Sequence, residues 1–253
     1  MQVVRRYRLT YLSLLLAFCL LAGVVAVSLA GGDDHSKEHR VISPTVTGAT
    51  QRTYALLSDI PQHGTELGDP AAPVTLQFFG DLQCRESRQV MLGPIPDLIR
   101  RFVRPGELRI VYRSTETDTR RAGGWPEFKD QQGAALAAGR QDRLWNFIDV
   151  FYREQGPEFT GYVDERFLHL IAVQAGLEMS HWQQAREPSW RWETGLKSDE
   201  ALARSTHVDS TPSFLVGPTG GPAHVLRHFA LEEPQPFEAA IREALKEASA
   251  PAV

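Results

Sequence analysis

The chain has 253 residues, of which 42% are hydrophobic and 23% are charged. This composition is ordinary for a globular protein and excludes an extended disordered chain, and the length allows one domain of moderate size or two small ones. The net charge is −4 and the body of the chain has no basic block, which excludes nucleic acid as an expected partner.

An apolar segment near the N-terminus predicts export. Arginines within residues 1–8 precede the uncharged stretch 9–30. A spanning helix needs about 20 residues, whereas the apolar part of a cleaved signal has about 7–15. We therefore expect a cytoplasmic n-region over 1–8 and a transmembrane helix over 9–30. A cleaved signal is the alternative, with Ser28–Ala30 as a passable cleavage site.

Both possibilities export the rest of the chain. Arginines stand before the span and Asp33 and Asp34 stand after it, so the positive-inside rule leaves the N-terminus in the cytoplasm. The expected location is a bacterial cell membrane, crossed once, with the C-terminal domain outside the cytoplasm. Residues 31–51 are polar and are predicted to form a linker, and 52–249 to form the domain.

The first half of the domain carries a strand, a helix and a strand. Strands are predicted over 74–79 and 108–112, and the helix between them is expected to begin near Cys84. Gly93 and the prolines after it should interrupt this helix. Such an arrangement within about forty residues is typical of a βαβ unit with parallel strands.

Helical periodicity then dominates from about 125 to 205. Strand patterns return at 213–216 and 224–229, joined by a segment rich in glycine and proline that predicts a hairpin. An amphipathic helix over 236–248 is expected to close the chain. The long helical segment is therefore interpreted as an insertion in an α/β domain.

Cys84 is the only thiol in the predicted domain, because Cys19 lies within the apolar span. No internal disulfide framework is possible. Cys84 stands between a strand and a helix, where the helix macrodipole can stabilise a thiolate. A single exported thiol is reactive, joined to another molecule, or buried and inert.

Two motifs resemble DsbA-like thioredoxin-fold proteins. The run Gly68–Val74 leading into Phe79–Cys84 resembles the active-site region of that family, and Val208–Phe214 resembles its cis-proline loop. The helical segment between them lies in the family's place, and the resemblance covers residues 68–245.

This resemblance implies an α/β, thioredoxin-like fold with a helical insertion. The sheet would be mixed, with four or five strands and helices on both faces. The resemblance also implies that the peptide bond between Thr211 and Pro212 is cis and that this loop lies against Cys84. Its backbone would pair with an extended polypeptide client by β-strand addition.

The motif departs from the family in its second half. The family expects Cys-x-x-Cys, whereas this chain has Cys84-Arg85-Glu86-Ser87. Ser87 cannot attack sulfur, although it can donate a hydrogen bond to a thiolate. Arg85 is expected to favour the thiolate and Glu86 to oppose it, so the net direction stays open.

We therefore expect monothiol thiol–disulfide exchange. Cys84 would form a mixed disulfide with a polypeptide client or a small thiol compound, and an external thiol or redox partner would resolve it. One alternative is a redox-inactive binding or chaperone-like module of the cell envelope. Another is oxidation in which a partner supplies the second cysteine. No cofactor is expected.

Other polar residues have simpler interpretations. Asp81 is expected either to accept a proton near the thiol or to cap the following helix. His224 and His228 are expected on one face of a strand with no further ligands, so no metal site is predicted. The polar loop residues Glu116, Asp118, Arg120 and His207 are expected to be solvated.

Overall fold

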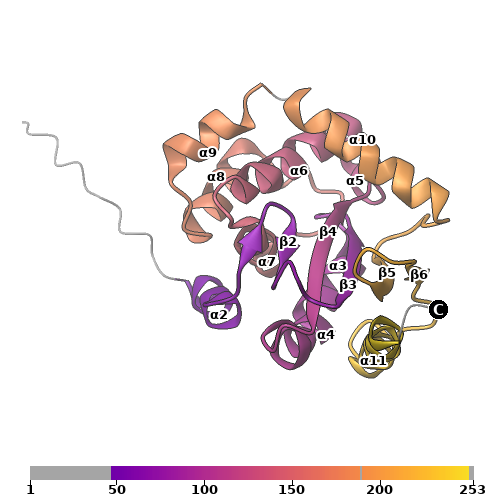
Figure 1. Cartoon of the computed structure of the whole chain (residues 1–253). Helices are drawn as coiled ribbons and strands as arrows, with labels where there is room; N and C mark the ends of the chain where they lie inside the picture. The colour runs from indigo at the N-terminus through magenta and orange to yellow at the C-terminus, as the bar shows by residue number, and fades with distance from the viewer. Residues whose placement is uncertain (1–46, 189, 251–253) are drawn as a thin grey trace, which may run out of the picture. The chain divides into compact units, whose positions relative to one another are not determined.

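The computed structural model describes residues 47–188 and 190–250 (Figure 1). The predicted n-region, the apolar span 9–30 and most of the predicted linker lie outside these residues. Within the described part of the chain, no helix has both the length and the hydropathy that crossing a bilayer requires.

A six-stranded mixed sheet runs through the described unit in the order β1-β2-β4-β3-β5-β6. Its strands are β1 (Gln62–His63), β2 (Glu66–Leu67), β3 (Val74–Gly80), β4 (Leu108–Ser114), β5 (Ser213–Pro218) and β6 (His224–Val225). β3 and β4 are parallel, and every other pairing is antiparallel. The predicted βαβ unit and the predicted hairpin are both confirmed.

The crossover from β3 to β4 is helical but interrupted. It consists of α3 (Arg85–Leu92), α4 (Pro94–Leu98) and the π-helical turn η1 (Ile99–Val103). Gly93 separates the first two helices, and Pro94 opens the second because it has no N–H to give to the preceding turn. The interruption predicted from the sequence is therefore present.

Helices fill the segment for which the sequence predicts an insertion. They are α5 (Thr119–Ala122), α6 (Trp125–Gly139), α7 (Leu144–Glu154), α8 (Glu165–Gln174), α9 (Met179–Arg186) and α10 (Trp190–Ser205). The C-terminal helix α11 (Gln235–Ser249) packs on β5 and β3. Figure 1 shows α6, α8, α9 and α10 above the sheet, with α4 and α11 below it.

Three sequence-based expectations need correction. The linker predicted over 31–51 ends earlier, because α2 (Gly48–Leu57) begins inside it. The sheet has six strands rather than four or five, since the short strands β1 and β2 extend it beyond β4. The last strand ends at Val225, and His228 has a positive φ of 59°, so His224 and His228 do not share a strand.

The end of β3 is fixed by aromatic packing. A Cβ at Gly80 would lie 2.9 Å from the Tyr112 ring, so only glycine fits there. The Tyr112 hydroxyl donates to the Gly80 carbonyl at 3.1 Å, and the Tyr152 hydroxyl donates to the Asp81 carbonyl at 3.2 Å. These contacts hold the turn that leads from the sheet to Cys84.

Candidate functional site

Cys84 is the N-cap residue of α3. Its backbone N–H donates to the Asp81 carbonyl at 3.0 Å, which closes the turn after β3. Its sulfur accepts a hydrogen bond from the Ser87 backbone N–H at 3.4 Å. The thiol therefore takes the place that Ser, Thr, Asp or Asn usually fills at a helix N-terminus, where free N–H groups need an acceptor.

The loop before β5 lies against this sulfur. The bond between Thr211 and Pro212 is cis, as the resemblance implies. The Cys84 thiol donates to the Thr211 carbonyl at 3.2 Å. The Thr211 hydroxyl in turn contacts the Thr117 hydroxyl at 2.5 Å, so the loop is tied to the segment after β4. Cys84, Thr211 and Pro212 are thus brought together.

The Cys84 thiol is closed off from solvent, with 0% of the residue exposed. Burial raises its pKa to about 12, because the charged thiolate is disfavoured away from water. Hydrogen bonds from the Ser87 and Thr211 hydroxyls and from the Ser87 backbone N–H lower this pKa, and the Asp118 side chain raises it. From the sequence alone, the net shift of the Cys84 pKa could be in either direction. The raised value means that the thiol is protonated at neutral pH.

The three residues after Cys84 act in different ways. Ser87 is buried, and its hydroxyl favours the thiolate, as expected. The same hydroxyl has no hydrogen bond of good geometry within the described residues. A carboxylate oxygen of Glu86 lies 3.5 Å from the sulfur, where its negative charge opposes the thiolate. Arg85 is exposed, and its backbone N–H donates to Glu158 at 3.1 Å.

Asp81 ties the segment after β4 to the site. Its buried carboxylate accepts from the backbone N–H groups of Thr117 and Thr119, both at 2.9 Å, and also from the Thr119 hydroxyl. It also accepts from the Gln83 N–H at 3.0 Å and from the Gln131 side chain at 3.3 Å. Burial raises the pKa of this carboxyl, and the hydrogen bonds lower it.

One of the two interpretations of Asp81 is therefore wrong. Asp81 does not cap α3, because Cys84 itself is the cap. The carboxylate instead accepts hydrogen bonds from the backbone N–H groups of the turn after β3 and of the loop after β4. These groups would otherwise be buried without acceptors. Asp81 is a positioning residue that holds Thr117 near Thr211.

Replacing Asp81 with asparagine is expected to destabilise the fold by about 2–4 kcal/mol, because an amide NH₂ would meet backbone N–H donors that need an acceptor. Urea unfolding of the full-length protein measures this change. Asp209→Asn is the matched control, since Asp209 is exposed and surface changes cost about 0.5 kcal/mol or less. Equal stabilities of the two variants would contradict the assigned role of Asp81.

The segment around Thr117 is the part of the site that sequence reasoning missed. Glu116 and Asp118 are only partly exposed, and the Glu116 N–H donates to Glu200 at 2.7 Å. The expectation of a solvated loop residue is wrong for Glu116, because Asp81 draws the loop inward, whereas Asp118 keeps partial access to solvent. Arg120 and His207 are exposed, as expected. The local sequence carried no signal for these long-range bonds.

One group of side chains in the described residues could hold a metal ion. Cys84, Glu86 and Asp118 present their sulfur and carboxylate oxygens within 4.8 Å of one another. Two of the three are carboxylates with access to solvent. We interpret the group as acidic surroundings that disfavour the thiolate.

These features together define a thioredoxin-like protein with an inserted helical region and a Cys-x-x-Ser site. A family model described as Thioredoxin matches residues 62–220, which is more than half of the chain. The chain belongs to this thioredoxin family. No curated protein matches its sequence.

Several solved structures share the fold. BdbD from Bacillus subtilis, in its oxidised form, has 16% identity and a TM-score of 0.60, covering 74% of this chain and 97% of that one. The alpha-DsbA1 protein of Wolbachia pipientis has 16% identity and a TM-score of 0.59, covering 78% and 96%. DsbA2 of Pseudomonas aeruginosa has 18% identity and a TM-score of 0.56, covering 75% and 98%. At such identities the likeness concerns the fold, which is DsbA-like.

Proposed function

We propose that this protein carries out monothiol thiol–disulfide exchange, in which Cys84 forms a long-lived mixed disulfide with an extended polypeptide client or a small oxidised thiol. The observation that carries the proposal is the position of the sulfur. It caps α3 and lies 3.2 Å from the carbonyl of Thr211, next to the cis bond to Pro212.

The exchange needs no cofactor and no oxidant other than the client disulfide. The Cys84 thiol loses its proton, and the thiolate attacks one sulfur of a disulfide. A new S–S bond forms at Cys84, and the other sulfur leaves as a thiolate and takes up a proton. Ser87 cannot carry out the second attack, so an external thiol must release Cys84.

The pKa of Cys84 makes both steps slow. A pKa of about 12 leaves few thiolates at neutral pH, although a more basic thiolate is a better nucleophile. The same basicity makes Cys84 a poor leaving group when an outside thiol attacks the mixed disulfide. The site therefore suits capture and retention of a client more than rapid turnover.

Formation of the disulfide would also alter the groove. When Cys84 is reduced, its thiol donates a hydrogen bond to the Thr211 carbonyl. A disulfide has no such hydrogen, so the carbonyl becomes free to accept a backbone N–H from an extended client. Covalent capture and strand addition would thus support each other.

We further propose that the domain works outside the cytoplasm of a bacterium while anchored in its membrane. The length of the apolar stretch 9–30 and the arginines within 1–8 support this proposal. The resolving thiol would then belong to a partner in the same compartment.

The test uses oxidised glutathione as a defined probe. Full-length protein is expected to gain one glutathione by mass spectrometry, and Cys84→Ala is expected to gain none. Cys19→Ala is the matched control and should react like the wild type. Absence of the adduct after long incubation at alkaline pH, or an equal adduct in Cys84→Ala, would overturn the proposal.

The second candidate is the redox-inactive binding module. The complete burial of Cys84 favours it, because a thiol that never opens can only fill space and bond to Thr211. In this case the wild type would form no adduct, and Cys84→Ala would keep the full function of the protein in the cell.

A further inference from the structure

A second site lies between α2, α4, η1 and α7 and shares no residue with the site around Cys84. We call it the arginine pocket, and its volume is about 340 Å³. It is lined by Arg52, Arg100, Arg104 and Arg153, together with Ala55, Leu56 and Pro96. None of these lining residues is a carboxylate.

Arg153 is the fixed element of the pocket. Its side chain is only 13% exposed and pairs with Asp149, which is fully buried. Two nitrogens of Arg153 reach the two oxygens of Asp149, at 2.7 and 3.2 Å, and the Thr53 hydroxyl also donates to this carboxylate. The guanidinium is therefore held in one orientation, and its remaining nitrogen has no hydrogen bond to any residue of the described ranges, so it can meet a ligand.

The other arginines leave positive charge without a partner. Arg100 pairs with the partly exposed Asp97 at 2.6 Å. Arg104 donates to the Leu56 carbonyl at 2.9 Å, and neither it nor Arg52 has an ion pair among the described residues. Four guanidiniums thus share two carboxylates, and the concave wall concentrates the remaining charge.

We propose that the arginine pocket binds a phosphate-bearing ligand. Guanidinium groups bind phosphate through paired N–H donors. Arginines from three elements suit a tetrahedral anion better than a planar carboxylate. The volume lies at the lower end of the roughly 300–1,000 Å³ of small-molecule sites. The phosphate comes from a lipid headgroup or from a soluble compound, and the test distinguishes these sources.

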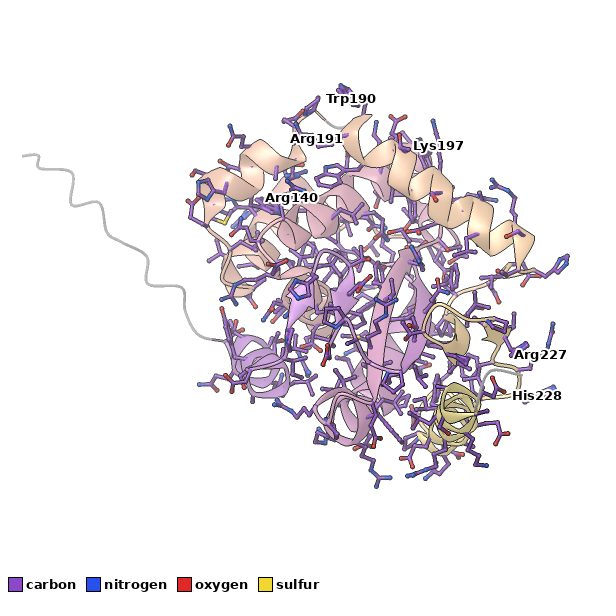
Figure 2. All side chains as sticks on the ribbon, viewed as in Figure 1. Arg140, Trp190, Arg191, Lys197, Arg227 and His228 are labelled. Carbon is purple, nitrogen blue, oxygen red and sulfur yellow. The ribbon has the colours of Figure 1, made fainter. Side chains whose placement is uncertain are left out.

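Pyrophosphate is the probe for the first measurement. Isothermal titration calorimetry of the full-length protein at constant ionic strength is expected to show one site. The double variant Arg52→Gln and Arg104→Gln should bind about tenfold more weakly or worse, because two of the phosphate donors are lost. The matched control is Arg140→Gln with Arg227→Gln, which removes the same charge from two exposed positions elsewhere (Figure 2). It should bind within about twofold of the wild type.

The single variant Arg52→Gln tests binding without a risk to the fold. The Arg52 side chain donates no hydrogen bond within the described part of the chain, so its loss should leave the fold intact. This variant is expected to weaken binding about threefold or more. Competition by phosphatidylglycerol vesicles, but not by phosphatidylcholine vesicles, would identify a lipid headgroup as the source. Its absence would identify a soluble phosphate. Equal binding by both double variants, or no binding at millimolar pyrophosphate, would overturn the proposal.

Discussion

Replacing Ser87 with cysteine is expected to turn the chain into a dithiol oxidant. The backbone N–H of Ser87 lies 3.4 Å from the Cys84 sulfur, and the Ser87 side chain is buried beside it. A sulfur in place of this hydroxyl can close an internal disulfide across the first turn of α3. The oxidised variant should then oxidise a reduced peptide about 100-fold faster than the wild type, which has no internal disulfide to transfer.

The matched control is Ser249→Cys, which adds a thiol at the exposed C-terminal end of α11. This variant should form no internal disulfide with Cys84 and should leave the peptide reduced. Oxidation is followed by loss of free thiols and by the mass of the reacted peptide. A Ser87→Cys chain that forms no internal disulfide would show that the geometry at the start of α3 is wrong.

Alkylation of Cys84 is expected to be slow and to accelerate steadily with pH. Its pKa of about 12 exceeds that of free cysteine, about 8.5, so the thiolate fraction at pH 7.5 is about 10³-fold smaller. A more basic thiolate is a better nucleophile, and this offsets about half of the logarithm of the loss in thiolate fraction. The rate should therefore lie about 30- to 100-fold below that of free cysteine, before burial lowers it further.

The sign of the pH dependence follows from the raised pKa. Each added pH unit deprotonates about ten times more thiol, so the rate should rise about tenfold per unit from pH 7 to 10 without a plateau. Iodoacetamide reacting with Cys19→Ala protein gives this profile, and the same protein in guanidinium should react like free cysteine. A plateau with a midpoint at or below about 8.5 would contradict the protonated, buried thiol.

Local patterns in the sequence were sufficient to predict the framework of the site. The apolar run that forms β3, the helix that starts at Cys84 and the interruption near Gly93 depend on neighbouring residues. The resemblance to DsbA-like proteins supplied the long-range part, namely that the Thr211–Pro212 loop lies against the thiol.

The closure of the site could not be predicted in this way. The Thr211 loop that accepts from the Cys84 thiol is tied through Thr117 to Asp81, whose partners Thr117 and Thr119 are 36 and 38 residues further along the chain. Helix α2 was missed because it lies in a polar context and is stabilised by burial of a few residues such as Leu57 rather than by a strong apolar face. The arginine pocket likewise exists only after α2, α4, η1 and α7 have come together.

A mixed disulfide at Cys84 should be broken only by an outside thiol, because Ser87 cannot attack it. The most direct measurement is the mass of full-length protein after reaction with oxidised glutathione and removal of all free thiol. We expect one glutathione on Cys84 that persists until a reductant is added. An unmodified Cys84, or an adduct that is released without any added thiol, would contradict it.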